Sequence, residues 1–265
     1  KMNSTYQVKK VREDVYQIME SGLDAMYVVC GKEKSILIDT GVGTGDLKSL
    51  VQKLTNTKID VYLTHGHRDH FGGTTQFPSV FLSPYDFELT KDIDVDKRKE
   101  YVEKMIHTGA ADKESLKEMR ILDWGNKPEL KPITNGQKIE LGDKTLTCIE
   151  VGGHTNGSVM YYDESNNIIF SGDGANPIMV LRKKADVDYK TYVSNWISKV
   201  KAINERINDQ TCICAGHDII ERDVWYQLIE MSERYLNGKL LPEKRKIHFY
   251  EDNFLINENV SILLG

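Results

Sequence analysis

A chain of 265 residues, with 40% hydrophobic and 28% charged side chains, has the composition of a soluble globular protein with a substantial core. It contains no run of about 18 apolar residues, which excludes a membrane-spanning helix. Its net charge of −5 disfavours nucleic acid as a partner, because phosphate backbones require a basic face. Residues 1–4 hold no apolar signal stretch, so we expect a cytoplasmic protein or one whose signal has been removed.

Alternating apolar and polar residues, bounded by turn residues, predict strands along the whole chain. We expect strands over residues 6–10, 15–20, 26–30, 35–39, 59–64, 144–151, 167–170, 211–214 and 246–264. Apolar residues at helical spacing predict helices over residues 46–54, 189–207 and 223–236. The apolar stripe of the helix over 189–207 is assigned to the core, and Asp188 is its expected cap.

The segment His-Gly-His-Arg-Asp-His, residues 65–70, directly follows the strand expected over 59–64. Four ligand-type side chains in six positions, interrupted by a glycine, do not suit a hydrophobic core but do suit a metal-binding site. The four are His65, His67, Asp69 and His70. Imidazole and carboxylate together suit zinc, iron or manganese. The sequence therefore predicts a metal site where this strand ends.

Three further candidate ligands follow strands in the same way. His154 comes after two glycines, Asp173 after Ser-Gly, and His217 after Ala-Gly. Because each follows a strand and a small residue, we expect these side chains to converge at one edge of a sheet. His107 and His248 lack this pattern and are predicted not to be ligands.

Together, His-x-His-x-Asp-His, a later Gly-His-Thr, a Ser-Gly-Asp and a final Gly-His resemble the metallo-β-lactamase superfamily. Within it they are closest to the glyoxalase II and lactonase-like hydrolases. The resemblance runs from residue 27 to residue 217, and the segment Ile-Leu-Ile-Asp-Thr-Gly at 36–41 is similar to the family's early strand and turn. It implies an α/β fold, the four-layer αβ/βα sandwich, formed by a single domain over residues 1–265 with two sheets inside and helices outside.

The resemblance also implies a division of the ligands between two divalent ions, most simply zinc, with manganese or iron as substitutes. His65, His67 and His154 are expected to hold one ion, and Asp69, His70 and His217 the other. Asp173 is expected to bridge the two ions. Asp69 and Asp173 are the expected catalytic residues, since Asp173 would fix the metal separation and Asp69 could also handle a proton.

Residues 84–124 are rich in charge, yet their apolar residues keep i,i+4 and i,i+3 spacing. We expect two or three amphipathic helices inserted between the first and second ligand loops. One interpretation is a cap over the metal cleft, and the other is a solvated helical excursion. Tyr85, Asn176 and Arg182 are candidate substrate contacts.

These features predict a hydrolase in which a metal-bridging hydroxide attacks an ester, thioester or lactone carbonyl of a small molecule. Two alternatives stay open: a phosphodiesterase or phosphatase with the same binuclear site, and a mononuclear iron enzyme similar to persulfide dioxygenases. The lack of a basic binding surface favours the carbonyl substrate. Neither a nucleic acid nor a membrane is expected as a partner, and the oligomeric state is left open.

Overall fold

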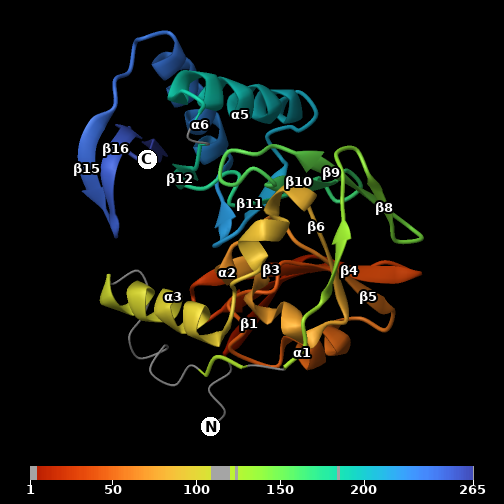
Figure 1. Cartoon of the computed structure of the whole chain (residues 1–265). Helices are drawn as coiled ribbons and strands as arrows, with labels where there is room; N and C mark the ends of the chain where they lie inside the picture. Colours follow the sequence, from red (N-terminus) through yellow and green to blue (C-terminus); the bar gives the residue numbers. More distant parts are fainter. Residues whose placement is uncertain (1–4, 109–119, 123–124, 184–185, 265) are drawn as a thin grey trace.

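The computed structural model describes residues 5–108, 120–122, 125–183 and 186–264 (Figure 1). Two sheets pack face to face, and helices cover their outer faces (Figure 1). A buried apolar cluster that includes Tyr27, Ile38, Tyr161 and Phe170 fills the space between the sheets. Separate clusters lie between each sheet and its helices. The four-layer α/β arrangement expected from the sequence is therefore confirmed.

The first sheet has seven strands in the order of the chain. They are β1 (Tyr6–Arg12), β2 (Val15–Glu20), β3 (Asp24–Val29), β4 (Lys34–Ile38), β5 (Lys58–Tyr62), β6 (Ser79–Leu82) and β7 (Glu129–Pro132). The strands from β1 to β4 pair antiparallel and those from β4 to β7 pair parallel. Because both faces of this sheet are covered, the inner strand β3 is buried at every residue.

The second sheet has six strands in the order β14-β13-β11-β10-β9-β8. They are β8 (Lys138–Glu140), β9 (Thr145–Glu150), β10 (Val159–Asp163), β11 (Ile168–Gly172), β13 (Cys212–Ala215) and β14 (Ile219–Ile220). The pair β11 and β13 is parallel, so the turns that follow these two strands lie at the same edge. Those turns carry Asp173 and His217.

A smaller sheet, in the order β12-β17-β16-β15, closes one end of the molecule. Its strands are β12 (Ile178–Leu181), β15 (Glu243–Ile247), β16 (Tyr250–Ile256) and β17 (Ser261–Leu264). β15 and β16 form a hairpin whose tip, residues 248–249, points toward the first sheet (Figure 1). At this tip His248 has a φ of 53°, an uncommon conformation for a residue other than glycine.

Three helices confirm the helical spacing seen in the sequence. They are α1 (Leu47–Leu54), α5 (Tyr189–Asn204) and α6 (Arg222–Leu236). The side chain of Asp188 accepts a hydrogen bond from the backbone N–H of Thr191, so it caps α5 as expected. Trp196 and Val200 of this helix are buried against the second sheet. Among the described residues, no helix is long and apolar enough to cross a membrane.

The remaining helical segments of the described residues begin within the first ligand loop. They are α2 (Arg68–Phe71), the 3-10 helices η1 (Gly72–Gln76) and η2 (Pro84–Thr90), and α3 (Val95–His107). In α3, Val102 and Met105 pack with Leu23, Val42 and part of Phe249. The rest of the expected insertion, residues 109–119 and 123–124, lies outside the described residues, so the helix expected there stays a prediction.

Candidate metal centre

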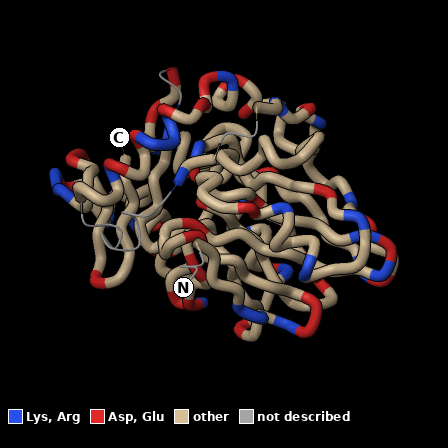
Figure 2. The backbone as a smooth tube through the Cα atoms, turned by 90° about the horizontal axis from the view of Figure 1, so that it is seen from below, with Lys and Arg blue, Asp and Glu red and all other residues tan. Residues whose placement is uncertain are grey.

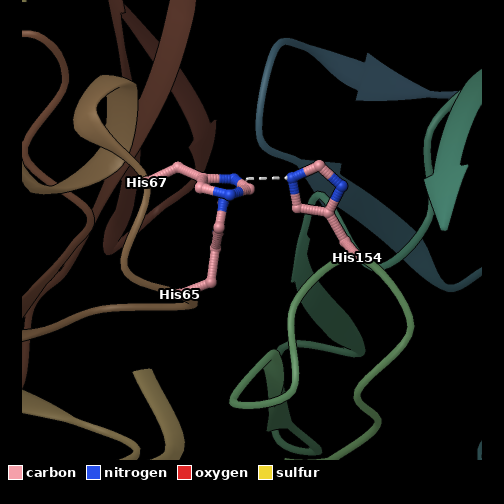
Figure 3. Close-up of side chains that lie close together, drawn as sticks. All are labelled: His65, His67 and His154. Atoms are coloured by element: carbon pink, nitrogen blue, oxygen red, sulfur yellow. Dashed lines mark hydrogen bonds between the residues drawn. The ribbon is translucent and has the colours of Figure 1, made fainter. Parts of the chain in front are cut away.

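Three imidazoles meet where the two sheets face each other (Figure 3). His65 and His67 come from the segment after β5, and His154 comes from the loop after β9. Nδ1 of His67 lies 2.8 Å from Nε2 of His154. The ring of His65 lies 4.8 Å from that of His67 and 4.9 Å from that of His154, centroid to centroid. We call these three residues the first cluster.

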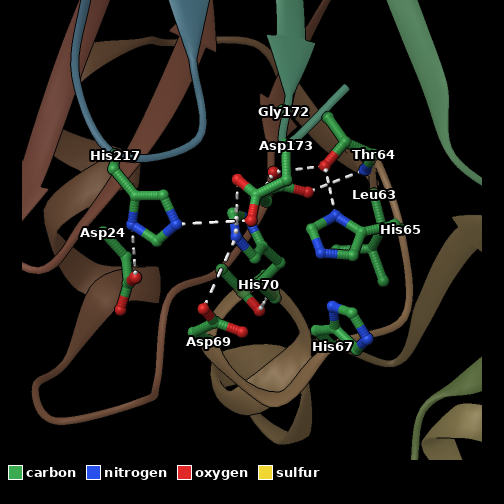
Figure 4. A network of polar contacts seen from close by, with 12 residues as sticks. Asp24, Leu63, Thr64, His65, His67, Asp69, His70, Gly172, Asp173 and His217 are labelled. Carbon is green, nitrogen blue, oxygen red and sulfur yellow. Dashed lines mark hydrogen bonds and ion pairs between the residues drawn. The ribbon is translucent and has the colours of Figure 1, made fainter. Parts of the chain in front are cut away.

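A second group of side chains lies beside the first (Figure 4). Asp69 and His70 belong to α2, and His217 belongs to the turn after β13. Nε2 of His70 lies 3.8 Å from Oδ2 of Asp69, and the rings of His70 and His217 are 5.6 Å apart. We call Asp69, His70 and His217 the second cluster.

Asp173 lies between the two clusters (Figure 4). Its Oδ2 is 3.4 Å from Nε2 of His154 in the first cluster and 3.3 Å from Nε2 of His217 in the second. Its Oδ1 is 3.5 Å from Nε2 of His70. A single carboxylate therefore reaches both groups. The structure thus brings together all seven residues that the sequence singled out as ligands.

Four of the five histidines are held through Nδ1, which leaves Nε2 directed into the centre. Nδ1 of His65 lies 3.1 Å from the hydroxyl of Thr64, and Nδ1 of His70 lies 2.9 Å from a carboxylate oxygen of Asp39. His154 and His217 donate through Nδ1 to the backbone carbonyls of Val180 and Leu23, at 2.9 and 2.7 Å. Anchoring one ring nitrogen in this way is how proteins orient a metal-binding imidazole.

The inward atoms also fit a metal ion chemically. Nε2 of His65, Nε2 of His70 and Oδ1 of Asp173 are buried and have no hydrogen-bond partner within the described chain. Buried polar atoms are rarely left in that state. Imidazole nitrogens and carboxylate oxygens are donors that zinc, manganese and iron accept. The residues present therefore fit a metal centre.

Comparisons with known proteins agree with this geometry. Residues 24–82 match the family described as the metallo-beta-lactamase superfamily. The chain is similar to the human acyl-coenzyme A thioesterase MBLAC2, with 27% identity over 89% of this chain and 80% of that protein. It is also similar to hydroxyacylglutathione hydrolase from Bdellovibrio bacteriovorus, with 23% identity over 53% of this chain and 43% of that protein.

Solved structures share the fold. A metallo-beta-lactamase from Pontibacter korlensis superposes with a TM-score of 0.59 at 17% sequence identity, over 86% of this chain and 99% of that one. The sec-alkylsulfatase Pisa1 from Pseudomonas sp. superposes with a TM-score of 0.64 at 16% identity, over 88% of this chain and 42% of that one. The chain has the metallo-beta-lactamase fold, and residues 24–82 carry the match to the superfamily. It is a metal-dependent hydrolase, as its sequence predicts.

Charge is unevenly distributed between the two clusters. Burial and the neighbouring His154 lower the pKa of His67 to about 3. Burial also disfavours the charged form of His70, but the carboxylates of Asp173, Asp39 and Asp69 outweigh it and raise its pKa to about 10. The first cluster therefore holds neutral imidazoles, and the second holds the carboxylate of Asp69 with the protonated imidazoles of His70 and His217. Metal uptake at the second cluster would release protons.

Two carboxylates that the sequence analysis did not single out support the ligand loops. Asp39, which directly follows β4 and has a φ of 62°, accepts hydrogen bonds from the backbone N–H and the hydroxyl of Thr64 and also lies beside Nδ1 of His70. Asp86 of η2 accepts hydrogen bonds from the backbone N–H groups of Gly66 and Gly157. Asp39 lies in the segment 36–41 that resembles the family's early strand and turn, whereas Asp86 has no local motif, and the partners of both are distant in the sequence.

A cavity of about 670 Å³ opens onto both clusters. Its walls come from α3, from the tip of the β15–β16 hairpin and from the loop around β12. The lining includes Tyr101, Lys104, Met105, Asn176, Ile178, Val180, Arg182, His248, Phe249 and Tyr250. Lys104 and Phe249 are in contact at the cavity wall, where Nζ of Lys104 lies 4.0 Å from the centroid of the Phe249 ring. The inserted helix and the C-terminal hairpin thus border the same cavity.

The three candidate substrate contacts have different positions. Asn176 and Arg182 line the cavity. Tyr85 is not among its lining residues, and its side chain is 66% exposed. Phe87, on the same 3-10 helix, packs against the core beneath the first sheet. The geometry therefore gives no support to Tyr85 as a substrate contact, because η2 turns this side chain toward solvent.

Proposed function

We propose that this protein is a binuclear metallohydrolase that cleaves thioesters of small molecules. The proposal of two ions is supported by the position of Asp173, whose carboxylate lies within 3.5 Å of histidine nitrogens from both clusters. The substrate class is supported by the similar proteins, which include an acyl-coenzyme A thioesterase and a hydroxyacylglutathione hydrolase.

In this proposal His65, His67 and His154 hold one ion, and Asp69, His70 and His217 hold the other, with Asp173 spanning both. Two divalent ions, zinc first and manganese or iron as substitutes, would supply an activated water and polarise the carbonyl. Asp69 lines the cavity and is positioned to accept a proton there. Asp69 and Asp173 are the proposed catalytic residues.

The cavity suits a substrate with an apolar acyl part and an anionic part. Met105, Ile178 and Phe249 offer apolar surface to an acyl chain. Arg182 contributes a positive charge close enough to affect His67 and His154, so it can orient a carboxylate or phosphate. Asn176 offers an amide at the same wall. Both residues are proposed substrate contacts.

We further propose that the insertion over residues 84–124 acts as a cap within a single domain. Four residues of α3 line the cavity, so this helix limits the volume available to the substrate. The exposed side chains of η2 show that the first part of the insertion does not contribute to the wall in the same way.

A small molecule is a better partner than a nucleic acid for this surface. Basic and acidic residues are interspersed along the described chain (Figure 2), and the net charge is −5. A phosphate backbone is bound by a continuous basic face. The phosphodiesterase alternative therefore receives less support than thioester hydrolysis.

The test is a substrate panel measured on one batch of purified protein with its metal content determined. The panel contains acyl-coenzyme A thioesters, hydroxyacylglutathione, lactones, β-lactams and phosphodiesters. We expect the highest kcat/KM for a thioester and two metal ions per chain. A preference for phosphodiesters would overturn the substrate class. One iron per chain with oxygen consumption would instead indicate a dioxygenase.

A further inference from the structure

Asp24 contacts His217 on the side of the ring that faces away from Asp173 (Figure 4). Its Oδ1 lies 3.2 Å from Nδ1 of His217, while Nε2 of the same ring lies 3.3 Å from Oδ2 of Asp173. The backbone carbonyl of Leu23 also accepts from this Nδ1, at 2.7 Å. The imidazole is therefore held from behind by two acceptors in adjacent residues of the chain.

The setting of Asp24 is unusual for a carboxylate. The residue begins β3, is 1% exposed, and its Oδ2 is buried without a hydrogen-bond partner among the described residues. A buried carboxylate is unfavourable unless nearby groups compensate it. Asp24 lies beside His217 of the second cluster, so a cation bound at that cluster would offset the cost of burying the negative charge of Asp24.

Tyr101 extends this contact into the inserted helix α3. Its hydroxyl lies 3.4 Å from Oδ1 of Asp24, and its side chain lines the cavity. The hydroxyl of Tyr101 in α3 and the imidazole of His217 in the turn after β13 therefore both contact Oδ1 of Asp24. The contacts run in sequence from the insertion, through β3, to His217.

We propose that Asp24 is a positioning residue for the second metal ion, which fixes His217 with Nδ1 protonated and Nε2 directed at the ion. This inference rests on the proposed binuclear function. A carboxylate behind a metal-binding imidazole fixes its tautomer and raises its basicity, and loss of such a partner lowers metal affinity about 10- to 100-fold. Tyr101 holds Asp24 in place.

The experiment compares Asp24→Ala, Asp24→Asn and Tyr101→Phe with wild type. Metal-free protein is titrated with zinc against a chromophoric chelator, and with cobalt(II) followed by its visible absorption. We expect Asp24→Ala to lower the affinity for the second equivalent of metal about 10- to 100-fold and to leave the affinity for the first equivalent unchanged. Asp24→Asn, which keeps an acceptor, should show a smaller loss, and Tyr101→Phe a smaller one still.

Asp60→Ala serves as the matched control, because Asp60 contacts Lys34 and Lys58 rather than a ligand. A wild-type protein that binds a single ion would overturn the binuclear proposal and this inference with it. If wild type binds two ions and both Asp24 variants bind them with unchanged affinity and cobalt spectrum, the positioning role alone is overturned. An equal weakening of both equivalents would likewise contradict it.

Discussion

Oδ2 of Asp86 accepts a hydrogen bond from the hydroxyl of Thr155 at 2.6 Å, which joins the start of the insertion to the loop that carries His154. The same oxygen accepts from the backbone N–H of Gly66, between His65 and His67. A Cβ at Gly157 would lie 2.6 Å from Cγ of Asp86, so only glycine permits this approach. One carboxylate thus connects the loops that form the first cluster.

Replacing Asp86 by alanine should destabilise the protein and loosen the first cluster. It leaves the buried N–H groups of Gly66 and Gly157 without their acceptor, which should lower the free energy of unfolding by about 2 to 4 kcal/mol. Urea unfolding measures this change, and metal titration should show a lower affinity for the first equivalent of metal. Asp92→Ala, at an exposed position of the same segment, should change neither. Matching results for the two variants would contradict the connecting role.

Asp173→Ala should reduce hydrolysis far more than stability. The residue spans the two clusters rather than packing in the core, and several kcal/mol of transition-state stabilisation corresponds to roughly 10²- to 10³-fold in rate. The measurement is kcat/KM at matched metal content, alongside thermal unfolding. His107→Ala and His248→Ala should retain the metal content of wild type. Wild-type activity in Asp173→Ala would refute the bridging role.

Protein purified without chelator should contain two metal ions per chain, and removing them should abolish hydrolysis. Each cluster offers three donors and leaves room for water or substrate. Elemental analysis gives the stoichiometry, and readdition of zinc should restore activity. A stoichiometry that stays near one in excess metal would count against two ions.

Met105→Ala should shift selectivity toward bulkier acyl groups. The side chain lies on the cavity wall, and removing it enlarges the space beside Phe249. We expect the ratio of kcat/KM for a bulky over a small thioester to change about 10-fold, with both ions retained. Tyr85→Ala is the control, because that side chain faces solvent. A shift in the Tyr85 variant of equal size would argue against α3 as the selecting wall.

Glu20 should make stability depend on pH. Burial raises its pKa above the usual 4.5, although hydrogen bonds from Thr44, Val42 and Gly43 oppose the shift. The folded state therefore binds this proton more tightly than the unfolded state, and stability falls as pH rises from 4.5 through the raised pKa. Unfolding free energies of wild type and Glu20→Gln, measured across that window, should move in favour of the variant with rising pH. A difference that is constant or opposite in sign would refute this.

The seven candidate ligands that the structure brings together could be singled out because each lies in a short local pattern. The segment at residues 65–70 and the Gly-His and Gly-Asp turns follow strands, so local sequence alone marks them. The helices and most strands that periodicity indicated lie close to their expected positions, as for the helix expected over 189–207 that ends at Asn204. The strands β6, β7, β8, β10, β12 and β14 were not expected, and the strand expected over 246–264 is the end of β15 followed by β16 and β17. The superfamily resemblance was confirmed, and it implied the layers.

The supporting residues could not be predicted, because their roles depend on contacts between distant segments. Asp24 contacts a histidine in a turn of the other sheet, and the partner of Asp86 in the second ligand loop is 69 residues away. A single acidic residue has no period and no motif. The position of Phe249 at the cavity likewise depends on the pairing of β15 with β16 and on the placement of that hairpin.

Each cluster takes two ligands from the first sheet and one from the second, and His67 and His154 are separated by 87 residues of chain. Neither half of the molecule can therefore complete a three-donor set by itself. We expect an ion to enter only after the halves have docked, and then to restrain them as a cross-link restrains a long loop. Removal of the ion should accordingly shorten the lifetime of the docked state as well as abolish hydrolysis.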